Sequence, residues 1–186
     1  SLSSDALDPA SIEIAAKVPG MVATHFVRNA RPGEKVRIAG PGGKYGLPEA
    51  PPPGITGFLH LCAGSGVAPN RGMIRNAVAR GWQQRHLLIV QDRTMEDALF
   101  RADWRDLVAS HSATFRVRHL YSRTDGHRIS SDAILRGAEG FLNLKESWAF
   151  VCGPSQSRPE GPSFMTRAQN ILEGELGFTA DRIRAE

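Results

Sequence analysis

The sequence has little cysteine and no long hydrophobic run, and these two absences narrow the class of protein. Its 186 residues include two cysteines, Cys62 and Cys152. Two widely separated cysteines are too few for the disulfide framework of a small secreted domain. No stretch approaches the roughly 18 consecutive apolar residues of a membrane helix, and the start lacks the pattern of a secretion signal. We therefore expect a cytoplasmic protein with no membrane span.

Metal-binding and nucleic-acid-binding patterns are also missing. The six histidines include no HExxH motif and no closely spaced pair, and the cysteines lack CxxC spacing, so we expect no metal site. The net charge is +4, but the arginines are scattered rather than gathered into a run. We interpret this charge as a solvated surface with a few arginines that face phosphate, and expect no nucleic-acid partner.

The first fifty residues contain the outline of a small β domain. Apolar residues alternate in 11–18 and again in 35–40, as in strands with one buried face, and a short helical pattern lies between them. Two short strands around one helix cannot close a barrel. We therefore expect residues 1–53 to be a partial antiparallel β-barrel that ends in a stiff, proline-rich linker.

Residues 54–186 show a different pattern, in which continuous apolar runs alternate with amphipathic helices. Such runs are typical of buried parallel strands. An alternating segment at 114–121 suits a strand nearer the sheet edge, and the last residues can add a fifth strand. The predicted fold is an α/β doubly wound, parallel five-stranded sheet, whose ligand binds beyond the carboxyl ends of its strands. The apolar runs are 57–62, 86–91 and 148–152.

The first buried strand leads into a loop that can hold phosphate. Ala63-Gly64-Ser65-Gly66 opens a helix whose backbone N–H groups can face a pyrophosphate. Pro69 would sit in the first helical turn, where no N–H group is needed. The loop is not the GxGxxG of a dehydrogenase, and an ordinary strand-to-helix turn is the alternative interpretation.

Several short motifs in this order resemble the ferredoxin-NADP reductase-like flavoproteins, a family that includes cytochrome b5 reductases and reductase components of bacterial oxygenases. Residues 1–4, SLSS, resemble the end of that family's Arg-x-Tyr-Ser flavin motif, and GPGGKY at 40–45 resembles its GPxGxF turn. Residues 62–69 are similar to its dinucleotide loop, and VCGP at 151–154 to its CGP motif. RIRAE at 182–186 resembles its C-terminal strand, which returns an acidic residue to the flavin.

The resemblance implies an NAD(P)H-dependent flavin oxidoreductase with FAD and NADP or NAD as cofactors. Residues 1–53 would be the partial FAD-binding domain with its linker, and 54–186 the NAD(P)-binding domain. The electrons would pass to a ferredoxin, to an iron–sulfur domain, fused or separate, or to an oxygenase component. Two alternatives stay open: a reductase of free flavin or ferric ions, and a dinucleotide-binding module of a larger protein that no longer transfers hydride.

The resemblance also assigns residues to the flavin. The sequence departs from the family's Gly-x-Val-Ser at the flavin pyrophosphate, so the hydroxyl there is missing or displaced by one position. Backbone N–H groups at that helix start can still hold phosphate. The residues implied on the flavin side are Ser1, Leu2, Ser3, Ser4, Gly20, Met21, Val22, Ala23 and Thr24.

On the dinucleotide side, the resemblance places Cys152 near the reacting nicotinamide carbon. Gly153 and Pro154 let the backbone approach the coenzyme. No His and carboxylate pair stands nearby in the sequence, so we assign Cys152 a positioning role rather than nucleophilic attack. A small buried apolar residue at a strand end is the alternative. Glu186 would tune the charge near the two rings or relay a proton.

Two further strand ends complete the predicted site. Asp92 and Arg93 follow the second strand, where the family often has an Asn-Arg pair near the coenzyme, although a surface salt bridge explains them equally well. Ser122, Arg123 and Arg128 follow the third strand, near the adenosine ribose of doubly wound folds. An arginine fork there favours the 2′-phosphate of NADPH. Some relatives that use NADH also carry Ser-Arg, and two solvated arginines are the simpler alternative.

Overall fold

The computed structural model describes residues 3, 11–15, 21–37, 43–157, 159 and 161–186. Its main feature is a sheet of five strands that are all parallel, in the order β3-β2-β1-β4-β5. The strand order runs outward from β1 in both directions, which is the doubly wound arrangement expected from the sequence. The strands are β1 (Gly57–Ala63), β2 (Arg85–Asp92), β3 (Phe115–Tyr121), β4 (Ser147–Cys152) and β5 (Ile183–Ala185).

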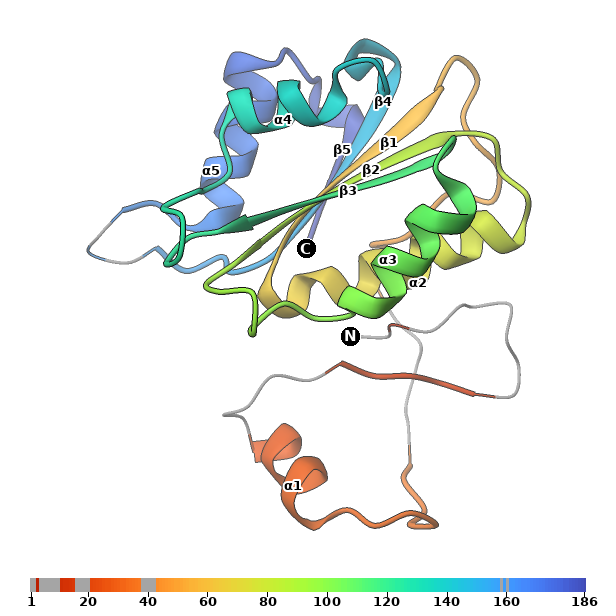
Figure 1. The fold of residues 1–186 in the computed structure, drawn as a ribbon, viewed down its shortest axis with the longest axis vertical. Coiled ribbons are helices and arrows are strands. Elements are labelled where there is room, and N and C mark those ends of the chain that lie inside the picture. Colours follow the sequence, from red (N-terminus) through yellow and green to blue (C-terminus); the bar gives the residue numbers. More distant parts are fainter. Residues whose placement is uncertain (1–2, 4–10, 16–20, 38–42, 158, 160) are drawn as a thin grey trace.

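Helices cover both faces of this sheet (Figure 1). Helices α2 (Val67–Ala79) and α3 (Arg101–His111) lie on one face. Helix α4 (Ser131–Ala138) and helix α5 (Phe164–Asn170), which continues as a π-helical turn over Ile171–Glu175, lie on the other. Three short 3-10 turns complete this part of the chain, at Gly64–Gly66, Leu144–Glu146 and Ala180–Arg182.

The central strand β1 is buried along its whole length, as its unbroken apolar run predicts. Leu59 and Leu61 belong to the core under α4 and α5, whereas Cys62 belongs to the core under α2 and α3. Alternate side chains of one strand therefore supply two cores. Strand β3 is only partly buried and forms one edge of the sheet, which confirms the expectation from its alternating sequence.

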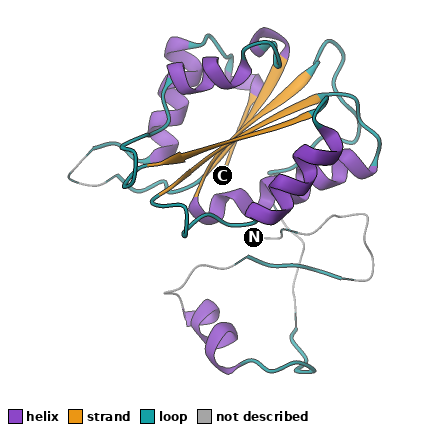
Figure 2. Cartoon of the chain, viewed as in Figure 1, coloured by secondary structure: helices purple, strands orange, loops and turns teal. Residues whose placement is uncertain are grey.

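The first part of the chain shows less regular structure than the sequence predicts. A helix α1 (Met21–Asn29) lies between the two predicted strands. The described parts of those strands, residues 11–15 and 35–37, contain one isolated β-bridge at Ile14 and are otherwise loop (Figure 2). Ile12, Ile14 and Val36 expose 61%, 57% and 54% of their surface, so no partner covers them within the described chain. The partial barrel therefore stays a prediction.

Helix α4 was not predicted from the sequence. The helix is only eight residues long, and it begins where the side chain of Ser130 accepts a hydrogen bond from the N–H group of Ala133. Ile134 and Ala133 turn inward from it, toward the core that also holds Leu59. Among the helices that the structure describes, none is long and apolar enough to cross a membrane.

Candidate functional site

The carboxyl ends of the neighbouring strands β1 and β4 lie together, at the edge of the sheet that is formed by the carboxyl ends of all the strands. Strand β1 pairs with β2 on one side and with β4 on the other, and Cys62 lies directly opposite Cys152. This adjacency is the one found in a doubly wound sheet, the fold that the sequence predicts. It also brings the loop after β1 and the turn after β4 together, at the position where doubly wound folds bind their ligands.

The loop after β1 is shaped by its two glycines. Gly64 has a positive φ of 54°, and a Cβ atom built on it would meet nothing within 4 Å, so this side of the loop is open. Gly66 has no such room: its Cβ would lie 2.2 Å from the carbonyl oxygen of Cys152. The loop forms a 3-10 turn that leads directly into α2, with Pro69 in the first helical turn. The backbone of Gly66 is thus pressed against the turn after β4.

The start of α2 fits a phosphate group. No side chain within the described residues caps the 3-10 turn or the helix behind it. The N–H group of Val67 at the start of α2 donates to the carbonyl oxygens of the 3-10 turn, so the helical segment begins with that turn. The first N–H groups of such a segment have no partner inside it, and the helix dipole favours an anion there. Together with the open side of Gly64, this start can hold the pyrophosphate of a dinucleotide by backbone N–H groups.

Cys152 ends β4 with little of its surface exposed, at 8%. Burial raises the pKa of Cys152 to about 11, and the negative charge of Glu186 is the second cause of this rise. The thiol is therefore protonated near neutral pH, which argues against a nucleophilic role. Gly153 follows with no room for a side chain, because its Cβ would lie 2.6 Å from the ring of Phe164.

Glu186 reaches the same edge through β5. Its N–H group donates a 3.0 Å hydrogen bond to the carbonyl oxygen of Val151, one residue before Cys152. Glu186 also lines a pocket of about 290 Å³, together with Tyr45 and Lys44 from the segment before β1. The last residue of the sequence and the turn that resembles GPxGxF therefore face one cavity, beside the Cys152 turn.

The ends of β2 and β3 are joined by backbone hydrogen bonds. The N–H and hydroxyl groups of Ser122 both donate to the carbonyl oxygen of Asp92, at 2.9 and 3.1 Å. The N–H group of Arg123 donates to Arg93 at 2.8 Å. The predicted pairs Asp92-Arg93 and Ser122-Arg123 thus lie side by side.

Arg128 comes from the loop that follows β3. The N–H group of Ile129 donates a 2.7 Å hydrogen bond to the Gln91 side chain, which fixes this loop to β2. The side chains of Arg93, Arg123 and Arg128 are all exposed, whereas Asp92 is buried. These three arginines can therefore meet a ligand at the sheet edge, and in the described part of the chain no hydrogen bond or ion pair holds their side chains.

The structure describes five of the nine residues assigned to the flavin. Ser1, Leu2, Ser4 and Gly20 lie outside the described residues. Met21, Val22 and Ala23 form the first turn of α1, and Thr24 follows in the same helix with its side chain half-buried. Ser3 is buried, and its N–H group donates to the carbonyl oxygen of Glu13 at 2.9 Å. The flavin assignment of these residues stays a prediction.

Two groups of buried polar residues next to the site were not identified from the sequence. Arg71 on α2 forms ion pairs with Glu13 and Asp103 and donates to the carbonyl oxygen of Ser3 at 2.7 Å. On the same helix, Asn70 is hydrogen bonded to Tyr45 and His60. Both groups connect residues far apart in the chain, and no local pattern signals such contacts.

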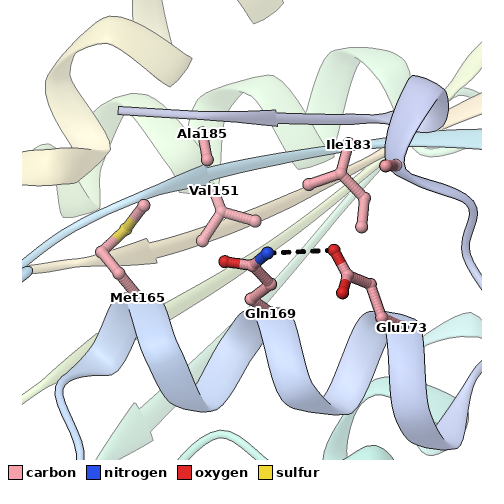
Figure 3. A pocket seen from close by; sticks show the side chains of 7 residues that line it. Val151, Met165, Gln169, Glu173, Ile183 and Ala185 are labelled. Carbon is pink, nitrogen blue, oxygen red and sulfur yellow. Dashed lines mark hydrogen bonds between the residues drawn. The ribbon is translucent and has the colours of Figure 1, made fainter.

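A second hollow lies beneath β4 and β5, on the face covered by α5 (Figure 3). Met165 and Gln169 of α5 and Glu173 of the π-helical turn point toward Val151 and the strand β5 above them. Gln169 donates a 3.0 Å hydrogen bond to Glu173. The volume of about 170 Å³ is smaller than that of ordinary small-molecule sites. None of the residues that we assigned to a cofactor lines this hollow.

Comparison with known proteins agrees with this geometry. Residues 61–157, just over half of the chain, match the oxidoreductase NAD-binding domain. An NADPH oxidoreductase of Mycobacterium tuberculosis is 31% identical over 144 residues, which cover 77% of this chain and 36% of that protein. The ferredoxin reductase component of a 3-ketosteroid-9-alpha-monooxygenase from Mycolicibacterium smegmatis is 28% identical, over 96% of this chain and 46% of that protein.

A solved structure shows the same fold. A ferredoxin NADP+ reductase from Neisseria gonorrhoeae, with bound FAD and NADP, superposes with a TM-score of 0.70 at 19% identity, over all of this chain and 77% of that one. The chain spans less than half of the length of the two curated relatives. The match over residues 61–157 includes β2 and β3 and both central strand ends, with the loop and the Cys152 turn. This chain belongs to the oxidoreductase NAD-binding domain family.

Proposed function

We propose that this chain is the dinucleotide-binding part of an NAD(P)H-dependent flavoprotein reductase. The observation that carries the proposal is the convergence of three segments at one sheet edge. The backbone of Gly66 touches that of Cys152, and Glu186 is bonded to the residue before Cys152. A phosphate-binding loop, a buried thiol and a carboxylate are thereby gathered where a dinucleotide fits. The names of the relatives, an NADPH oxidoreductase and a ferredoxin reductase component, point to the same class of reaction.

In this proposal the cofactor supplies the electron chemistry and the chain supplies binding and orientation. FAD accepts an electron pair as hydride and releases electrons one at a time. The start of α2 holds the coenzyme pyrophosphate, and the small Gly153-Pro154 turn admits the nicotinamide. The protonated thiol of Cys152 offers a compact, neutral surface beside it. The Glu186 carboxylate keeps negative charge close to the reacting rings or relays a proton.

The flavin side of the proposal rests on residues 1–53, which we assign to a partial FAD-binding domain. Ser1 to Ser4 and Gly20 to Thr24 are its proposed contacts. The acceptor is a one-electron partner protein or a fused iron–sulfur or oxygenase domain. Both cysteines are free thiols, which is consistent with a cytoplasmic location.

The test is anaerobic mixing of the purified protein with NADPH while the flavin absorbance is followed. We expect NADPH to reduce the flavin, and added ferredoxin or ferricyanide to reoxidise it. Faster turnover with free flavin or ferric ions than with any protein acceptor would favour a reductase of small molecules. Dinucleotide binding without any flavin reduction would contradict the reductase and would favour a non-catalytic binding module.

A further inference from the structure

A chain of buried polar side chains runs from the dinucleotide loop into the sheet. Its members are His86 on β2, His60 on β1, Asn70 on α2 and Tyr45 before β1. His60 and Asn70 expose none of their surface and His86 exposes 2%. Burying polar groups costs free energy unless they are hydrogen bonded. Three buried groups joined to the half-buried Tyr45 beside a ligand site therefore point to a specific role.

The distances join the four side chains to the loop. His60 Nε2 lies 3.1 Å from His86 Nδ1, and His60 Nδ1 lies 2.8 Å from Asn70 Oδ1. Asn70 Nδ2 donates to the carbonyl oxygen of Gly66 at 3.1 Å and to the hydroxyl of Tyr45 at 3.0 Å. Gly66 is the residue whose backbone is pressed against Cys152. The amide of Asn70 thus touches the loop, the sheet and the segment before β1.

The directions of the hydrogen bonds from Gly66 through Asn70 and His60 to His86 follow from one carbonyl group. The Gly66 oxygen can only accept, so the amide nitrogen of Asn70 must face it and the amide oxygen must face His60. His60 therefore carries its proton on Nδ1, which leaves Nε2 as an acceptor for the Nδ1–H group of His86. The remaining His86 Nε2 is then unprotonated, and it has no hydrogen-bond partner among the residues the structure describes. Because this nitrogen carries no proton, the neutral, buried ring leaves no N–H donor without an acceptor at that position.

The surrounding rings and the burial keep both histidines neutral. The His60 ring lies nearly parallel to the rings of His86 and Phe150, with centroid distances of 5.3 Å to each. Burial lowers the pKa of His60 to about 4, and burial followed by the charge of His60 lowers that of His86. The pair therefore presents a fixed Nδ1–H donor to Asn70 at neutral pH.

We propose that Asn70 is a positioning residue for coenzyme binding. Its amide, oriented by His60 and His86, fixes the Gly66 carbonyl and links it to the Tyr45 hydroxyl. Tyr45 in turn lines the pocket that contains Glu186. The segment before β1 and the dinucleotide loop are thereby held in one arrangement, so that coenzyme meets a loop already set against the Cys152 turn. This inference rests on the proposed function, because it assumes that the Gly64–Gly66 loop holds the coenzyme.

The tautomers can be tested without any coenzyme. Long-range ¹H–¹⁵N spectra of the protein distinguish protonated from bare ring nitrogens. We expect Nδ1–H for both His60 and His86, assigned by loss of each signal set in His60→Gln and His86→Gln. An Nε2–H form of His60 would overturn the proposal, because Asn70 would then present its amide oxygen to the Gly66 carbonyl.

The positioning role is tested by coenzyme affinity. Asn70→Leu keeps the branched shape of the side chain but removes the amide, and we expect it to raise the Kd for NADP+ and for NAD+ by the same factor, about five- to tenfold, as the loss of a buried hydrogen bond does. Tyr45→Phe should raise both by about twofold, and should add nothing on the Asn70→Leu background. Met73→Ala is the control, because Met73 lies on the same helix as Asn70, in a buried apolar cluster with Phe58 and Phe150.

The control separates positioning from general loss of stability. Met73→Ala should lower Tm and leave both Kd values unchanged at a temperature well below the transition. Equal effects of Asn70→Leu and Met73→Ala, or unchanged Kd values in Asn70→Leu, would overturn the positioning role. If leucine prevents folding, Asn70→Ser carries the same prediction, because serine cannot reach Gly66 and His60 together. An unsubstituted protein that binds neither coenzyme would instead contradict the proposed function.

Discussion

At position 66 the chain has no room for a side chain, because a Cβ atom would lie 2.2 Å from the carbonyl oxygen of Cys152. Backbone atoms on both sides of this contact cannot move aside as a flexible side chain can. We expect Gly66→Ala to lower the free energy of unfolding by about 1–3 kcal/mol, as overpacking does, and to abolish detectable NADP+ binding. Chemical denaturation and calorimetric titration measure the two effects.

A second glycine provides the matched control for this substitution. Gly174 lies in the π-helical turn of Ile171–Glu175, and its Cβ would meet nothing within 4 Å. Gly174→Ala should therefore leave stability within about 0.5 kcal/mol and coenzyme binding unchanged. Equal losses in the two variants would show that the close contact at Gly66 is not what makes the position sensitive.

The exposed arginines beside Ser122 give a prediction for coenzyme choice. Replacing Arg123 and Arg128 together by alanine should raise KM for NADPH by at least about tenfold, which is about 1.4 kcal/mol. KM for NADH should change little, because only NADPH carries a 2′-phosphate for the arginines to bind. Arg105→Ala on the exposed side of α3 controls for a simple loss of positive charge. Equal losses with both coenzymes would rule out this role.

Among the elements, the five strands were predictable because burial repeats along them. The unbroken apolar run of β1 and the alternating run of β3 indicated a central and an edge strand, and the structure places them so. The short helix α4 was missed because eight residues carry little periodic signal. The strands expected at 11–18 and 35–40 depend on pairing partners, which alternation of side chains alone does not supply.

The candidate site, like the fold, was predictable from the sequence only in part. Its glycine loop and the Cys152 turn follow directly from local sequence, since each stands at the end of a buried strand. Arg71 and Asn70 were missed because their partners lie at Glu13, Asp103 and Tyr45, between 25 and 58 positions away along the chain. Nothing in the sequence around either residue indicates these distant partners.

Arg71 gives a prediction at the scale of elements, because it connects α2 to α3 and to the segment around Glu13. Its side chain is buried, bonded to two carboxylates and stacked on Phe100 at 4.6 Å. We expect Arg71→Met to lower the free energy of unfolding by about 2 kcal/mol, less than for a fully buried pair, because both carboxylates keep contact with water. Arg75 lies 3.9 and 4.0 Å from the same carboxylates and is far more exposed. Arg75→Met should cost less than about 0.5 kcal/mol, and an equal cost would contradict the account.

For the whole molecule, the buried histidines predict how stability depends on pH. The pKa of His60 is about 4 in the folded protein and 6.5 when unfolded, so the unfolded state binds more protons between these values. The stabilisation that neutral His60 provides, on the order of 3 kcal/mol, is fully present above pH 6.5 and is lost as the pH falls toward 4. Denaturant titrations at several pH values across this range should show that the free energy of unfolding depends less steeply on pH in His60→Gln than in the unsubstituted protein. An unchanged slope would mean that His60 is not buried in its neutral form.

The central claim is that the carboxyl edge of the sheet binds the coenzyme through the loop between β1 and α2. Titration of ¹⁵N-labelled protein with NADP+, followed by backbone amide shifts, tests this most directly. We predict the largest shifts at Gly64, Ser65 and Gly66, with further shifts at Gly153 and Arg123. Shifts confined to the hollow beneath β5, around Gln169 and Ile183, with an unaffected loop, would contradict the account.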